Sequence, residues 1–138
     1  MITDAKPALV GIVVADMARA LAFYRLLGLD IPAGADAEPH VDVGLPGGLR
    51  LAFDTEETIA SFHPSWKPGT GGGRVSLAFA LPDPAAVDAA YEQLTAAGHH
   101  GELAPFDAFW GMRYATVHDP DGTGVDLFAP LPDGAVAG

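Results

Sequence analysis

The chain has 138 residues, which is enough for one domain or for two small modules that share a core. It has no cysteine, which excludes disulfide frameworks and thiolate metal sites. Its 18 acidic and 7 basic residues give a formal charge of −11, which argues against nucleic acid and anionic membranes as partners. The charge favours cationic or neutral ligands, or simply keeps the protein in solution. No membrane-spanning run of about 18 apolar residues and no signal segment is evident, so we expect a cytoplasmic protein.

The first half of the chain begins with a strand and a helix. The β-branched run at residues 10–14 predicts a buried strand. Asp16 follows as an N-cap, because its carboxylate can accept hydrogen bonds from free amides of a first helical turn. Gly28 suits the left-handed position after a helix, so the predicted helix covers about residues 17–27.

Beyond this helix, the pattern predicts a loop, an edge strand, a turn and a second strand, over residues 30–38, 40–44, 45–48 and 49–53. The stretch at residues 54–73 breaks the pattern and predicts no regular element. It ends in a threonine and three glycines at residues 70–73, which we expect to be a flexible joint.

The second half repeats this order. Residues 75–81 predict a strand, and Asp83 followed by Pro84 predicts the start of a helix over residues 84–96. An aromatic loop is expected at residues 104–111. A hairpin is expected from two strands, residues 112–117 and 125–128, which flank a strong turn signal.

The two halves also share residues at a constant offset of 67 positions. At this offset Asp16 matches Asp83, Tyr24 matches Tyr91 and Leu27 matches Leu94. We therefore predict one α+β domain over residues 1–138, built from two similar modules with a cleft between them. Module one covers about residues 8–60 and module two about residues 73–130.

The segments around both helices and the late turn carry a family resemblance. Residues 14–17, 23–24 and 27–29, together with the Asp-Pro-Asp-Gly run at residues 119–122, resemble the vicinal oxygen chelate superfamily. This superfamily includes glyoxalases, extradiol dioxygenases, fosfomycin-modifying enzymes and bleomycin resistance proteins. The resemblance covers about residues 8–130 and implies two tandem βαβββ modules whose curled mixed sheet encloses a cleft, commonly in a homodimer.

The resemblance also implies where metal-binding members hold their ion. These positions are Leu9 and Ser76 on the first strands of the modules, Asp126 on the last strand, and either Arg50 or Ala52 in module one. Divalent metals in enclosed sites need three or four imidazole or carboxylate donors. The sequence therefore predicts a metal-free cleft without a cofactor, and none of the five histidines has the spacing of a metal-binding pair.

Aromatic and charged side chains are the candidates for ligand binding, and no residue is assigned a catalytic role. The predicted ligand-binding residues are Arg50, His63, Trp66, Phe106, Phe109, Trp110, Arg113 and Asp126. Aromatic rings on loops make stacking surfaces for planar ligands, although they equally suit a plug in the cleft or a dimer interface. Asp126 is either a base or partner for a ligand amine within the cleft, or an outward residue paired with Arg50 or Arg113.

Three functions are consistent with these features. The first is a metal-independent binding protein, similar to bleomycin resistance proteins, that sequesters a planar aromatic or cationic antibiotic. The abundance of Ala, Gly and Pro suggests a bacterium with a GC-rich genome. The second is a glyoxalase- or dioxygenase-type lyase or isomerase with a non-standard metal site or an Asp126 acid–base. The third is a structural or regulatory module with a vestigial cleft.

Overall fold

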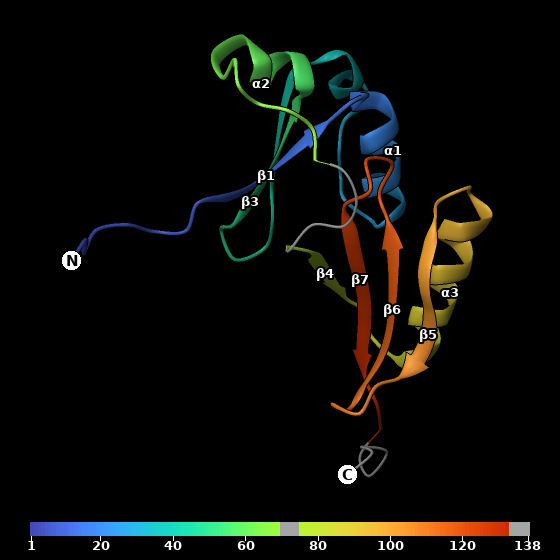
Figure 1. Cartoon of the computed structure of the whole chain (residues 1–138). Helices are drawn as coiled ribbons and strands as arrows, with labels where there is room; N and C mark the ends of the chain where they lie inside the picture. The colour runs from blue at the N-terminus through green and yellow to red at the C-terminus, as the bar shows by residue number, and fades with distance from the viewer. Residues whose placement is uncertain (70–74, 133–138) are drawn as a thin grey trace. The chain divides into compact units, whose positions relative to one another are not determined.

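The computed structural model describes residues 1–69 and 75–132, which form two compact units (Figure 1). The first unit is Met1–Pro68 and the second is Gly69–Gly138. The joint that we predicted at residues 70–73 lies outside the described residues. Each unit is considered by itself below.

The first unit is a three-stranded sheet with helices. Its elements in chain order are β1 (Leu9–Val14), α1 (Met17–Leu26), the 3₁₀ helix η1 (Ala33–Ala37), β2 (His40–Gly44), β3 (Arg50–Thr55) and α2 (Glu56–Phe62). The strand order is β1-β3-β2, with β1 parallel to β3 and β2 antiparallel to it. The parallel pair needs a long crossover, which α1, η1 and β2 supply.

Helix α1 begins and ends where the sequence predicts. The Asp16 side chain accepts a hydrogen bond from the Arg19 amide at 3.0 Å, and Gly28 follows the helix with φ of +94°. The helix contributes Phe23 and Tyr24, both fully buried, to the core of the unit. The Tyr24 ring lies 5.0 Å from the ring of Phe53 on β3, so the helix is anchored to the central strand.

Two helical segments appear where we predicted irregular chain. Helix α2 lies in the stretch at residues 54–73, because the Thr55 hydroxyl accepts from the Thr58 amide at 3.2 Å. Glu56 and Glu57 occupy the first turn, where negative charge favours a helix N-terminus. The predicted loop at residues 30–38 contains η1, a short helix that local hydrophobic spacing does not reveal.

The second unit is a four-stranded sheet covered on one face by a helix. Its elements are β4 (Leu77–Ala80), α3 (Pro84–Ala96), β5 (Gly101–Asp107), β6 (Met112–His118) and β7 (Gly124–Pro130). The strand order is β4-β7-β6-β5, with β4 parallel to β7 and the other pairs antiparallel. Helix α3 lies along β5, β6 and β7 (Figure 1).

Helix α3 has the predicted bounds, because its ends carry strong local signals. Asp83 accepts from the Ala86 amide at 2.8 Å, Pro84 opens the first turn, and Gly98 has φ of +98°. Strand β5 was not predicted, and it includes half of the expected aromatic loop. Its register against β6 shifts twice before Phe106, which breaks the two-residue alternation that identifies a strand.

The alternation of β6 and β7 gives their sheet two different faces. Ala115, Val117, Val125 and Leu127 are fully buried, on the face that α3 covers. Burial of a Val or Leu side chain is worth about 1.5–3 kcal/mol, so this face holds the unit together. The intervening residues point to the opposite face, which we call the open face of the second unit.

A tight turn fixes the register between β6 and β7. The Asp119 carboxylate accepts hydrogen bonds from the amides of Asp121 and Thr123, both at 2.9 Å, and is 4% exposed. Gly122 has φ of +87°, a conformation that favours glycine. The resulting hairpin pairs Thr116 directly with Asp126.

The predicted α+β class and the repeated strand–helix–strand order are confirmed. Among the described residues, the first unit has three strands and the second has four, so the βαβββ order is complete only in the second. Within the described part of the chain, no helix is both long enough and apolar enough to span a membrane.

Candidate functional site

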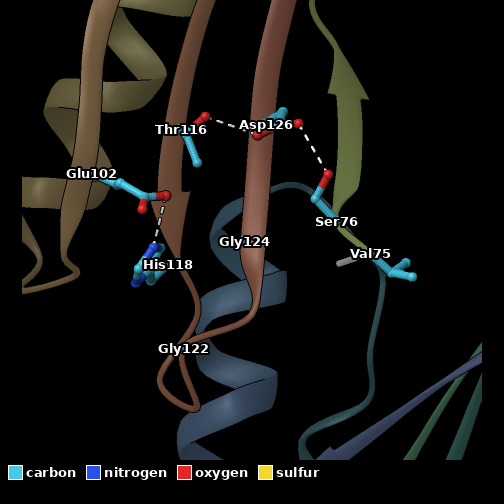
Figure 2. A pocket seen from close by; sticks show the side chains of 8 residues that line it. All are labelled: Val75, Ser76, Glu102, Thr116, His118, Gly122, Gly124 and Asp126. Carbon is cyan, nitrogen blue, oxygen red and sulfur yellow. Dashed lines mark hydrogen bonds and ion pairs between the residues drawn. The ribbon is translucent and has the colours of Figure 1, made fainter. Parts of the chain in front are cut away.

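The open face of the second unit carries a carboxylate that accepts hydrogen bonds from three hydroxyl groups. Oδ1 of Asp126 on β7 accepts from Thr116 at 2.8 Å. Oδ2 accepts from Ser76 at 3.2 Å and from Tyr114 at 2.5 Å. Figure 2 shows Ser76 and Thr116 on either side of Asp126. Three neighbouring segments of chain therefore contribute to one polar cluster.

A pocket of about 220 Å³ opens beside this cluster. Its lining residues are Val75, Ser76, Glu102, Thr116, His118, Gly122, Gly124 and Asp126 (Figure 2). Nε2 of His118 lies 2.9 Å from a carboxylate oxygen of Glu102. The pocket is smaller than the roughly 300–1,000 Å³ typical of whole drug-sized ligands, so it suits one small group of a ligand.

Tyr114 connects the carboxylate to aromatic side chains. Burial, together with the hydrogen bond to Asp126 and its negative charge, raises the pKa of Tyr114 from 10.0 to about 12. The phenol therefore stays protonated and donates to Asp126 over the physiological pH range. Sequence reasoning missed Tyr114, because only the pairing of β6 with β7 shows that it shares a face with Asp126.

Four aromatic rings form a continuous cluster around Trp110, which we call the aromatic cluster. The ring centroid of Trp110 lies 5.2 Å from Tyr114, 5.0 Å from Phe109 and 6.2 Å from Phe106, each in an edge-on arrangement. Phe109 is 75% exposed and Trp110 is 47% exposed, which is unusual for such large apolar side chains. The structure thus brings four of the predicted site residues together: Phe106, Phe109, Trp110 and Asp126.

Arg113 also lies on β6, but its side chain points to the face that α3 covers, away from Asp126. Its guanidinium binds Asp88 of α3 at 2.9 Å and Asp107 of β5 at 3.1 Å. The hydrogen bond to Asp88 is the main reason why the pKa of Arg113 is raised further above its ordinary value. The structure therefore separates Arg113 from Asp126, and the suggested ion pair between them is absent.

The other three predicted site residues belong to the first unit. Arg50 at the start of β3 pairs with Asp42 of β2 at 2.6 Å. His63 is an exposed residue that ends α2, and Trp66 follows it half-buried. Their role in ligand binding stays a prediction.

The strand registers identify which residue of the first unit corresponds to Asp126. Gly11 pairs with Ala52 between β1 and β3, and Ala78 pairs with Asp126 between β4 and β7. Gly11 and Ala78 are related by the same offset of 67 residues that relates the two helices. Ala52, rather than Arg50, therefore occupies the position equivalent to Asp126.

The residues at the metal positions that the resemblance implies do not fit a divalent ion. Leu9 and Ala52 have no donor atom, and Ser76 offers a neutral hydroxyl that already donates to Asp126. One carboxylate cannot replace the three or four donors that such sites use. Elsewhere among the described residues, no group of three or more His, Asp or Glu side chains has a metal-binding arrangement.

Solved structures with the same fold come from several bacteria. A glyoxalase/bleomycin resistance protein/dioxygenase from Nocardioides has 25% sequence identity and a TM-score of 0.71, over 97% of this chain and 89% of that one. A family enzyme from Burkholderia phytofirmans PsJN has 21% identity and a TM-score of 0.78, over 92% and 100%. A superfamily member from Sphaerobacter thermophilus DSM 20745 has 27% identity and a TM-score of 0.64, over 91% and 97%.

The family itself follows from the sequence comparison. No curated protein sequence gives a significant match. A profile of the Glyoxalase/Bleomycin resistance protein/Dioxygenase superfamily matches residues 6–127, which is most of the chain. The predicted resemblance is thereby confirmed: this chain belongs to the glyoxalase/bleomycin resistance protein/dioxygenase superfamily, the vicinal oxygen chelate group.

Proposed function

We propose that this protein binds and sequesters a planar aromatic or cationic small molecule without a metal. The observation that carries the proposal is the connection made by Tyr114 on the open face of the second unit. Its ring belongs to the aromatic cluster and its hydroxyl donates to Asp126. Stacking surface and anionic acceptor are thus adjacent, which suits a ligand with a flat part and a positive or hydrogen-bond-donating part.

The aromatic cluster supports binding by stacking. Phe109 and Trp110 leave much of their ring surface exposed, and each ring is held edge-on by a neighbour. An aromatic pair is worth about 0.5–1.5 kcal/mol beyond the apolar area that it buries. An aromatic side chain has only two rotatable bonds, so it loses little conformational freedom when a ligand covers it.

Sequestration requires only affinity and abundance. A ligand that binds the folded protein lowers its own free concentration, and no bond needs to be broken. We propose that the chain confers antibiotic resistance in this way, as a homodimer in the bacterial cytoplasm. The unsuitable residues at the metal positions support a role without metal chemistry.

A thermal-shift screen tests this proposal. Planar antibiotics with an amine or a fused ring system are the first set, and Zn²⁺, Ni²⁺, Mn²⁺ and Fe²⁺ are the second. We expect one planar class to raise Tm, because only ligands of the native state stabilise it, and the metals to leave Tm unchanged. Recovery of the intact ligand after incubation would show that it is bound and not modified.

The Trp110→Ala variant is the matched test of the site. It should abolish the ligand-induced shift, while Phe62→Ala, which removes an exposed aromatic ring of α2, controls for the general loss of a large ring. A metal that raises Tm by several degrees and survives dialysis would overturn the proposal, as would chemical conversion of the ligand.

One observation favours an enzyme as the second candidate. The hydroxyl of Tyr114 lies 2.5 Å from Asp126, so these groups could act as an acid–base pair on a bound substrate. Isomerisation of methylglyoxal–glutathione hemithioacetal, which needs only proton transfers, would favour this alternative if it is lost in Asp126→Asn and in Tyr114→Phe.

A further inference from the structure

The hydrogen bonds that the described residues donate to Asp126 leave one acceptor position open. An ionised carboxylate offers about four lone-pair positions, two on each oxygen. Among the described residues, Ser76 and Tyr114 both donate to Oδ2, whereas Thr116 alone donates to Oδ1. One position therefore remains on Oδ1, and Asp126 is a lining residue of the pocket.

The pocket favours a donor with positive charge. Its ionisable side chains are Asp126, Glu102 and His118, and no described lining residue is a lysine or an arginine. Glu102 lies 2.9 Å from His118, whereas the partners of Asp126 among the described residues are all neutral hydroxyls. Within residues 1–69 and 75–132, no side chain supplies a counterion for this negative charge, and a ligand cation would supply one.

We propose that this pocket is the subsite for a single protonated nitrogen of the ligand, which donates to Oδ1 of Asp126. The proposal rests on the proposed binding function and narrows it to planar molecules that carry an ammonium group. The flat part of the ligand lies on the aromatic cluster, and Tyr114 separates the two subsites. The small volume of the pocket, about 220 Å³, admits the ammonium group and a short linker.

Two ligands with the same ring test the charge preference. The first is 2-naphthylmethylammonium, and the second is 2-naphthoate, which presents a carboxylate instead. Binding is followed by titration of each compound into ¹⁵N-labelled protein. We expect the ammonium compound to bind at least about tenfold more tightly, because hydrogen bonds between charged groups are the strong ones. The amides of Thr116 and Asp126 should shift with it.

Two isosteric variants separate the local effect from the net charge. Asp126→Asn should reduce the affinity for the ammonium compound about tenfold or more and leave that for neutral 2-naphthylmethanol almost unchanged. Glu92→Gln removes the same charge from the exposed side of α3 and should have little effect.

The outcomes distinguish the subsite from the binding function. If all three naphthyl compounds bind equally and shift only the amides of Phe109 and Trp110, the ammonium subsite is wrong and the aromatic binding surface stands. Equal loss of affinity in Asp126→Asn and Glu92→Gln also overturns the subsite, since net charge then explains the preference. If neither these compounds nor planar antibiotics bind, the proposed binding function fails as well.

Discussion

At the scale of single residues, the chemistry of the second unit depends on Asp126 and Tyr114. The carboxylate holds the phenol proton in place, and the phenol shares the negative charge of the carboxylate through a 2.5 Å hydrogen bond. This mutual dependence can be measured, because the pKa of Tyr114 reports on the presence of the charge at Asp126.

Asp126→Asn should lower the pKa of Tyr114 from about 12, because two of its three causes, the hydrogen bond and the negative charge, then weaken. Burial is the largest cause and remains, so the pKa should stay above 10.0. NMR titration of tyrosine labelled at Cζ measures this change. Glu92→Gln is the control, and an unchanged pKa in Asp126→Asn would contradict the role of Asp126.

The same pair gives a pH dependence of stability. The folded-state pKa of Tyr114 is raised, so its contribution to stability is complete below about pH 10. That contribution is lost as the pH rises through about 12, where the folded protein also loses the proton. The loss should be smaller in Asp126→Asn, and urea unfolding at a series of alkaline pH values measures it.

The sequence predicted some of these side chains and missed others for a physical reason. Asp126, Phe106, Phe109 and Trp110 were predicted because a charged or aromatic residue among turn and strand signals is visible locally. Tyr114 was missed because its significance arises from strand register, which joins residues 12 positions apart in the chain. Arg113 was predicted as a site residue, but it lies one position before Tyr114 on the strand and therefore points to the face that α3 covers.

At the scale of secondary structure, the β6–β7 hairpin is the element that positions the site. Its turn contains Gly122 with φ of +87° and holds Thr116 opposite Asp126. An L-residue in this conformation costs about 1–2 kcal/mol, so Gly122→Ala should destabilise the protein by about that amount. Chemical denaturation measures the change.

Gly34→Ala in η1 is the matched control. Gly34 has no left-handed φ, and no atom lies within 4 Å of an added Cβ. This substitution should be neutral or slightly stabilising, because alanine restricts the unfolded chain. Equal destabilisation by both substitutions would contradict a special role for the conformation of Gly122.

Helices were more predictable than strands where their ends carry side-chain signals. Asp16 and Asp83 cap their helices as predicted, because capping is a contact between residues three apart. Helix α2 was overlooked although Thr55 caps it in the same way, since its seven residues carry no buried side chain and so no apolar stripe. Strand β5 was overlooked because its register against β6 is irregular.

At the scale of the whole molecule, net charge opposes folding. The chain carries a formal charge of −11, whereas each exposed ion pair, such as Arg50 with Asp42, contributes at most about 1 kcal/mol. Salt screens both the repulsion among the acidic groups and the attraction within the ion pairs. The repulsion should be the larger of the two, because acidic groups are in excess. We therefore expect Tm to rise with NaCl at pH 7, as measured by calorimetry. A fall in Tm would show that the ion pairs dominate instead.

The turn at Asp119 has a consequence for how such a protein can change its ligand. The carboxylate of Asp119 and the conformation of Gly122 align β6 with β7 from within the turn, without a contribution from residues 116 and 126. Positions 116 and 126 therefore stay side by side whatever residues they carry. The Asp-Pro-Asp-Gly run at residues 119–122, which carries the family resemblance, therefore preserves the strand register and gives no information about the ligand. Substitutions on the open face can thus change the ligand a few side chains at a time, while the β6–β7 hairpin keeps its structure.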